Sequence, residues 1–114
     1  MLQKEHVANM TSLFNDCLET AKSKGDAYSD SGTGGDCLAN FKKFAEDAGV
    51  TKYQTWLIFF NKHVSAISNA IKINPENPVD KSEGLSGRIM DGIVYLTLLY
   101  SMLYEQDTSD ANKE

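Results

Sequence analysis

The stretch EGLSGRIMDGIVYLTLLYSMLYE, residues 83–105, decides the fold. Its second half carries an aliphatic or aromatic residue at most positions, and the stretch contains no proline. A helix that is apolar around most of its circumference must be buried on several faces, by its own chain or by a partner. We therefore expect this helix to form the centre of an all-α domain.

Three polar residues interrupt the apolar character of this helix: Arg88, Asp91 and Tyr95. Their spacing of i, i+3 and i+7 places them on one stripe of the helix. Two interpretations remain open. Arg88 and Asp91 form an intrahelical ion pair with a structural role, or the stripe contacts a ligand, because buried polar groups require partners.

Three further helices are expected upstream. Residues 3–24 carry apolar side chains at three- and four-residue spacing, and Gly25 supplies a stop signal. The second expected helix covers residues 36–48, with Asp36 as its N-cap. Gly49 follows it and suits the left-handed position after a helix.

The third upstream helix spans residues 51–73 and begins with the capping box Thr51-x-x-Gln54. Pro75 and Pro78 separate it from the last helix. The chain shows no strand-like alternation and no internal repeat, so we expect a compact all-α bundle of about four helices. Residues 1–106 form this single domain, and we expect the polar residues 107–114 to be a disordered tail.

The helices at 51–73 and 83–105 are apolar on wider faces than a chain of 114 residues can cover. We therefore expect a homo-oligomer that is formed through one of these two helices.

Charge and composition exclude several classes of protein. The net charge is −5, which disfavours a general nucleic-acid-binding protein with a basic face. No apolar run reaches the roughly 18 residues of a membrane span, and the N-terminus lacks an apolar signal-peptide core. Two cysteines make neither a disulfide framework nor a metal-finger spacing. We expect a cytoplasmic protein with reduced thiols.

The segment GDAYSDSGTGGDC, residues 25–37, is a long glycine-rich loop. It matches neither the calcium-loop nor the phosphate-loop pattern. Two interpretations stay open for it: a flexible lid or linker, and a loop that is organised around a ligand.

The candidate ligand-binding residues are the polar side chains that lie among apolar ones. They are Tyr28, Asn40, Lys62, His63, Glu83, Arg88, Asp91 and Tyr95. If helices 51–73 and 83–105 pack antiparallel, the Lys62/His63 pair meets Arg88 and Asp91 across the bundle. Guanidinium and ammonium groups suit a phosphate, and the rings of Tyr28, Phe41 or Trp56 suit a base. For His63 alone, a hydrogen-bonded core histidine is the competing interpretation.

Four segments in order carry a resemblance to a known family: KGDAYS, ANFKKFAEDAGV, WLIFFNKHVSAI and SEGLSGRIMDGIVYL. Over residues 20–104 the chain resembles small phage and bacterial proteins of the nucleotide modification associated domain 1 type. The matching positions are Lys24/Tyr28, Asn40/Phe41, Lys62/His63, Glu83 and Arg88/Asp91/Tyr95. The resemblance implies a link to nucleotides and no particular reaction.

The last helix is also similar to the final metal-binding helix of the all-α nucleoside triphosphate pyrophosphohydrolases. Those enzymes have Glu-x-x-Asp-x-x-x-Tyr there, and the two acids hold magnesium. This chain keeps Asp91 and Tyr95 but has Arg88 in place of the glutamate. A cation in a ligand position argues against a hydrolytic multi-metal site and favours binding without hydrolysis.

The leading hypothesis is a phage-type protein that binds a nucleotide or a nucleotide-derived signal without hydrolysing it, with no catalytic residue and no cofactor. Two roles stay open for such a protein: nucleotide metabolism and counter-defence. One alternative is a magnesium-dependent pyrophosphohydrolase with a degenerate metal site at Asp91 and Glu83. The other is an interaction protein that blocks a host factor in the host cytoplasm. None of the three places the protein in a membrane.

Overall fold

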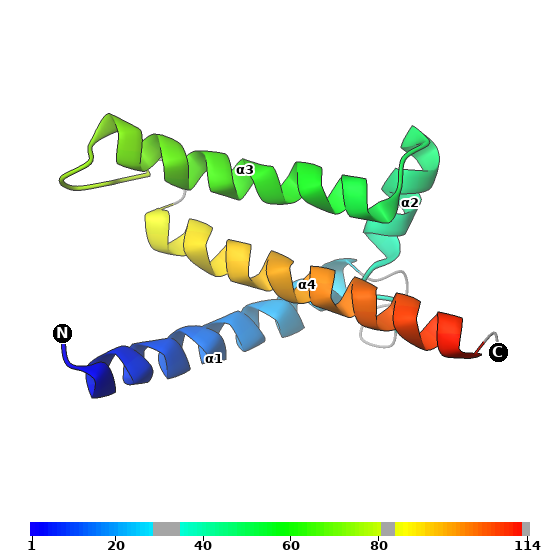
Figure 1. Ribbon diagram of the computed structural model, residues 1–114, viewed down its shortest axis with the longest axis horizontal. Helices are drawn as coiled ribbons and strands as arrows, with labels where there is room; N and C mark the ends of the chain where they lie inside the picture. The colour runs from blue at the N-terminus through cyan, green and yellow to red at the C-terminus, as the bar shows by residue number, and fades with distance from the viewer. Residues whose placement is uncertain (29–34, 81–83, 113–114) are drawn as a thin grey trace.

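The computed structural model describes residues 1–28, 35–80 and 84–112, with the side chains of 24–28 and 110–112 excepted. Within these ranges it contains four helices and no strand: α1 Gln3–Tyr28, α2 Ala39–Ala48, α3 Lys52–Ile73 and α4 Leu85–Asn112 (Figure 1). The expected all-α bundle is confirmed. Residues 29–34 of the loop expected at 25–37 lie outside the described residues, so neither interpretation of the loop is tested.

Two helices are longer than the sequence predicts. α1 continues through Gly25 to Tyr28, because a glycine inside a helix costs only about 1 kcal/mol and does not by itself end it. α4 continues to Asn112, so the expectation of a disordered tail is wrong for residues 107–112. No proline or glycine follows Glu105, and nothing in the covalent structure stops the helix there.

The ends of the two middle helices largely follow the predicted capping. Thr51 and Gln54 form the complete capping box at the start of α3, and Gly49 adopts a φ of 70° after α2. The start of α2 differs: Asp36 accepts a hydrogen bond from the Leu38 amide at 2.9 Å, and the helix begins three residues after it. Asp36 therefore stabilises the turn that leads into α2 rather than capping the helix itself.

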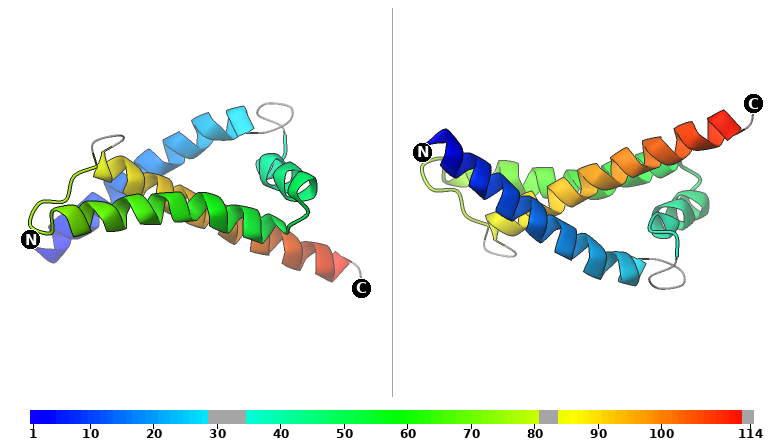
Figure 2. Two further views of the ribbon diagram at one scale, coloured as in Figure 1. Left: turned by 90° about the horizontal axis from the view of Figure 1, so that it is seen from above. Right: turned by 90° about the horizontal axis from the view of Figure 1, so that it is seen from below.

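α4 is the central helix, as the sequence predicts. α3 runs antiparallel along it, and α2 packs near the N-terminal end of α3 (Figure 1). α1 crosses the first turns of α4 on the side away from α3 (Figures 1 and 2). The core lies where α2, α3 and α4 meet and contains Leu38, Phe41, Trp56 and Met102. The Trp56 indole N–H donates to the Tyr95 carbonyl at 2.6 Å and so fixes the register of α3 on α4.

Among the described residues, α1 packs mainly against α4. The Cys17 thiol lies 3.8 Å from the Met90 carbonyl, and the Thr20 hydroxyl lies 3.8 Å from the Met90 sulfur. Burial, and after it the charges of Asp16 and Asp91, raises the pKa of Cys17. Part of the apolar face of α1 thus makes a narrow contact with α4. The described residues leave the rest of that face uncovered.

That uncovered surface is the α1 stripe, which comprises Val7, Met10, Phe14 and Leu18. Their exposed fractions are 48%, 39%, 46% and 58%. These four residues belong to the apolar side chains at three- and four-residue spacing that predict this helix, and the structure shows them exposed. Helical periodicity identifies the residues that share a face, but it does not identify what covers that face.

The chain as a whole has a larger accessible surface than is usual for its mass. The accessible surface is 8096 Å², whereas a folded monomer of 12.6 kDa exposes about 6,200 Å². The radius of gyration of 16.6 Å also exceeds the value of about 13 Å for a compact domain of this length. Separately, none of the helices in the described ranges is long and apolar enough to cross a membrane.

Candidate functional site

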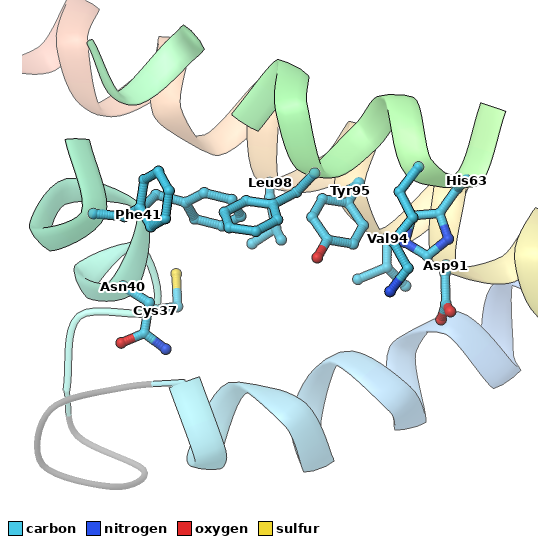
Figure 3. Close-up of a pocket in the computed structure, with 11 residues that line it drawn as sticks. Cys37, Asn40, Phe41, His63, Asp91, Val94, Tyr95 and Leu98 are labelled. Carbon is cyan, nitrogen blue, oxygen red and sulfur yellow. The ribbon is translucent and has the colours of Figure 1, made fainter. Parts of the chain in front are cut away.

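A cavity of about 460 Å³ lies between α2, α3 and α4 (Figure 3). Its size falls within the range of small-molecule sites, roughly 300–1,000 Å³. It is lined by Cys37, Asn40, Phe41, Phe44, Phe59, Lys62, His63, Asp91, Val94, Tyr95 and Leu98. Cys37, Asn40 and Phe41 lie at the α2 end of the cavity, and His63 and Asp91 lie at the opposite end (Figure 3).

Edge-to-face packing fixes the aromatic wall of the cavity. The Phe41 ring lies 5.9 Å from Phe59 and 6.1 Å from Tyr95, and the Phe44 ring lies 5.5 Å from Phe59. Interplanar angles of 69° to 85° are the geometry that aromatic pairs favour. The rings therefore hold one another in place and leave a preformed surface for a flat, apolar group.

The polar end of the cavity is buried. His63 and Asp91 are only 5% and 8% exposed. The His63 imidazole lies 5.1 Å from the Tyr95 ring at an angle of 44°. α3 therefore supplies an imidazole and α4 a carboxylate and a phenol to one region of the cavity (Figure 3). These groups together can accept and donate hydrogen bonds to the edge of a heterocycle or to hydroxyl groups.

Five of the eight candidate site residues line this cavity: Asn40, Lys62, His63, Asp91 and Tyr95. Asn40 and Lys62 are exposed, and the other three lie deeper. Lys62 and His63 face Asp91 and Tyr95 across the α3–α4 contact, as antiparallel packing predicts.

Arg88 is not among the residues that line the cavity. Its Nε donates to Asp80 Oδ2 at 2.7 Å, and the two side chains are only 10% and 12% exposed. This buried ion pair ties the connection between α3 and α4 to the second turn of α4. The sequence predicts Asp91 as the structural partner of Arg88. The structure adds Asp80, which follows the turn at residues 74–77, where the Asn77 amide donates to Asn74.

Two candidate residues cannot be placed. Glu83 and the side chain of Tyr28 lie outside the described residues, so their predicted contacts stay predictions. Trp56, one of three rings considered for stacking a base, lies in the core and does not line the cavity. Phe41, another of the three, does line it.

Sequence reasoning missed five residues of the cavity wall: Cys37, Phe44, Phe59, Val94 and Leu98. Four of these have apolar side chains at helical spacing, which is also the pattern of core residues. No signal in a single sequence separates a residue that lines a cavity from one that fills the core.

Among the described residues, no group of three or more histidine, cysteine, aspartate and glutamate side chains could hold a metal ion. Because Glu83 lies outside them, the suggested magnesium site at Asp91 and Glu83 stays a prediction.

No family model matches the chain, and comparisons with curated proteins and with solved structures give no match either.

Proposed function

We propose that the protein binds a nucleotide or a nucleotide-derived small molecule in the cavity between α2, α3 and α4, without hydrolysing it. One observation carries the proposal. Five residues selected from the sequence as nucleotide ligands line a single cavity, beside a wall of aromatic rings. A base needs a flat apolar surface, and a phosphate needs a cation.

Each part of the cavity matches a part of such a ligand. The base lies against Phe41 and Phe59, with its edge toward His63 and Asp91. Lys62 reaches a phosphate at the exposed rim as a point charge. With one lysine and one aspartate among the described lining residues, the cavity suits a ligand that carries few phosphates. The resemblance to the nucleotide modification associated domain 1 proteins, which are small phage and bacterial proteins, adds the link to nucleotides. We propose a role in nucleotide metabolism or in counter-defence.

A ligand screen by thermal shift tests this function. The panel contains nucleosides, nucleoside mono- and triphosphates and cyclic oligonucleotides, each with and without magnesium. A ligand at 100 times its Kd stabilises the folded protein by about 2.7 kcal/mol, which raises the Tm of a chain of this size by about 10 °C. Magnesium-dependent release of pyrophosphate would instead support the hydrolase, and no shift with any nucleotide would support the interaction protein.

We also propose that the protein self-associates in the cytoplasm. The sequence predicts α3 or α4 as the interface, and this stays a prediction, with Leu57, Ile58 and Leu96 51%, 57% and 50% exposed. We propose the α1 stripe as a further surface that a second copy of the chain covers. The surface in excess of a closed monomer is about 1,900 Å² per chain. A symmetric pair that buried it would remove about 3,800 Å² in total, which is within the range of obligate homodimers. The stripe is apolar, as such interfaces are.

Light scattering at micromolar concentration tests the association. Phe14→Glu places a charge in the stripe and should shift the particle toward the 12.6 kDa monomer. Ser12→Glu, on the opposite side of α1, is the matched control and should leave the mass unchanged. A wild-type monomer would contradict the self-association, whereas an unchanged oligomer in Phe14→Glu would exclude only the α1 stripe as its interface.

A further inference from the structure

The placement of α2 determines the shape of the cavity. This helix and the residue two positions before it supply Cys37, Asn40, Phe41 and Phe44 to the wall. α2 has only ten residues, and a helix that short is not stable by itself in water. Its position therefore depends on its contacts with α3 and α4.

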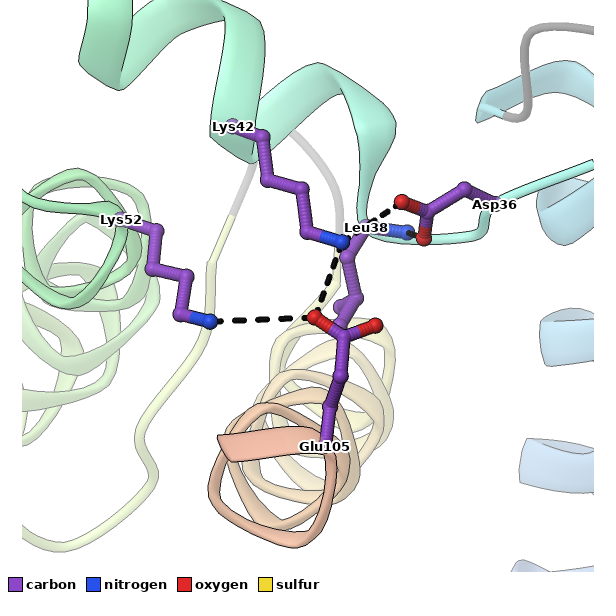
Figure 4. Close-up of polar contacts among 5 residues, drawn as sticks. All are labelled: Asp36, Leu38, Lys42, Lys52 and Glu105. Atoms are coloured by element: carbon purple, nitrogen blue, oxygen red, sulfur yellow. Dashed lines mark hydrogen bonds and ion pairs between the residues drawn. The ribbon is translucent and has the colours of Figure 1, made fainter. Parts of the chain in front are cut away.

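One of these contacts is a chain of ion pairs, the Lys42 network, which comprises Asp36, Lys42, Lys52 and Glu105. The Lys42 ammonium lies 2.7 Å from Asp36 Oδ2 and 2.8 Å from Glu105 Oε1, and Lys52 lies 3.8 Å from the same Glu105 oxygen (Figure 4). The four side chains come from four segments: the turn before α2, α2 itself, the first residue of α3, and α4. Lys42 thus joins α2 to α4 and to its own leading turn.

The network lies away from the ligand cavity. None of its four members lines the cavity. Next to it, Leu38 and Met102 are 1% and 0% exposed, so the network covers the edge of the core where α2 meets α4. Its effect on a ligand can only be indirect, through the position of α2.

The charges of the network depend on one another. Burial lowers the pKa of Lys42, but hydrogen bonds to Asp36 and Glu105 outweigh burial and raise that pKa. The hydrogen bond from Lys42 in turn lowers the pKa of Asp36, against the effect of burial. The side chains of Lys42, Asp36 and Glu105 are 37%, 40% and 44% exposed, so dissolved salt reaches and weakens the network.

We propose that Lys42 is a positioning residue for the cavity: by bridging Asp36 and Glu105 it holds α2 against α4, and it thereby keeps Phe41 and Asn40 in the cavity wall. The part of this inference that is measured by ligand binding rests on the proposed function. If only the docked position of α2 binds ligand, the apparent Kd equals the intrinsic Kd divided by the docked fraction. Salt then weakens the binding even of a nucleoside, which itself carries no charge for salt to screen.

Hydrogen exchange measured by mass spectrometry tests the positioning role without a ligand. Each exposed ion pair is worth up to about a fivefold change in an equilibrium constant. Lys42→Met removes two pairs, so the α2 amides should exchange about threefold to tenfold faster, while the α3 amides keep their rate. Lys43→Met is the matched control, because Lys43 is the exposed neighbour and takes no part in the network. Lys42→Arg should restore slow exchange, and 1 M NaCl should accelerate α2 exchange in the wild type and in Lys43→Met but not in Lys42→Met.

A titration with adenosine and guanosine completes the test, since neither carries a phosphate. We expect their Kd to rise in Lys42→Met by the factor by which the docked fraction falls. If the Lys42→Met protein does not fold, Glu105→Gln supplies a milder loss of one pair. Equal α2 exchange in Lys42→Met and Lys43→Met, or faster exchange spread evenly over α2 and α3, would overturn the inference. Faster α2 exchange in a protein that binds no nucleoside or nucleotide would instead leave the positioning role in place and refute the proposed function.

Discussion

Replacing Arg88 with alanine separates a structural role for this residue from a ligand-binding role. The Arg88–Asp80 pair is almost fully buried, with side chains 10% and 12% exposed. Removing one partner of a buried pair leaves the other charge without compensation, at a cost of about 3–5 kcal/mol. We take the lower figure, about 3 kcal/mol, because Arg88 and Asp80 both make further contacts. For a chain of this size the loss lowers the Tm by about 12 °C.

Urea unfolding at a fixed protein concentration measures this loss, because self-association makes the apparent stability depend on concentration. The double variant Arg88→Met/Asp80→Leu is the control. It removes both charges and should recover most of the stability, since apolar side chains of similar volume replace buried ion pairs at little cost. Below its unfolding transition, Arg88→Ala should bind nucleotides as the wild type does. A destabilisation under 1 kcal/mol together with a tenfold or greater rise in Kd would refute the structural role and place Arg88 in the ligand site.

Three further predictions follow from individual residues. Lys62→Met should raise the Kd of nucleotides about threefold to fivefold, because one exposed charge pair contributes about that factor. The Kd of nucleosides should stay unchanged, and calorimetry measures the Kd of both kinds of ligand. A thiol reagent should modify the exposed Cys37 quickly and the buried Cys17 only on unfolding, and a nucleotide should slow the reaction of Cys37 because this residue lines the cavity. Since the folded-state pKa of Asp36 is lowered, its contribution is present above about pH 4 and is lost as the pH falls through the folded pKa. Intrinsic amide exchange slows as the pH falls, so the readout is the protection of the α2 amides, the ratio of the intrinsic to the observed exchange rate. This protection should fall in that acidic range in the wild type, and Asp36→Asn should lose this dependence on pH.

The sequence predicts the local structure of this protein well where short-range chemistry decides it. The capping box of Thr51 and Gln54 and the left-handed Gly49 depend on neighbours within a few residues, so a single sequence reveals them. Gly25 was misleading, because a glycine ends a helix only where the chain turns into the left-handed region.

The tertiary partners of charged residues are much harder to predict. Arg88 pairs with Asp80 across a turn, and Lys42 pairs with Glu105 from another helix. Neither pair follows a helical spacing such as i, i+4, which is the spacing that sequence analysis can recognise.

Sequence analysis identified polar residues of the candidate site but did not identify most of its apolar residues. Polar side chains among apolar ones stand out, and His63 and Asp91 do lie together at one end of the cavity. Phe59 and Val94 show the same periodicity whether they fill a core or line a cavity. The exposure of Phe14 likewise depends on how α1 docks, which its own periodicity does not specify.

The most direct test of ligand binding in the cavity is a calorimetric titration of three proteins with the nucleotide that gives the largest thermal shift. Val94→Phe adds a ring inside the cavity, and Leu96→Phe adds the same ring two residues along α4, where the side chain is 50% exposed. We expect one nucleotide per chain in the wild type and in Leu96→Phe, and a Kd at least tenfold higher in a folded Val94→Phe protein. Equal affinity in all three proteins would contradict binding in this cavity.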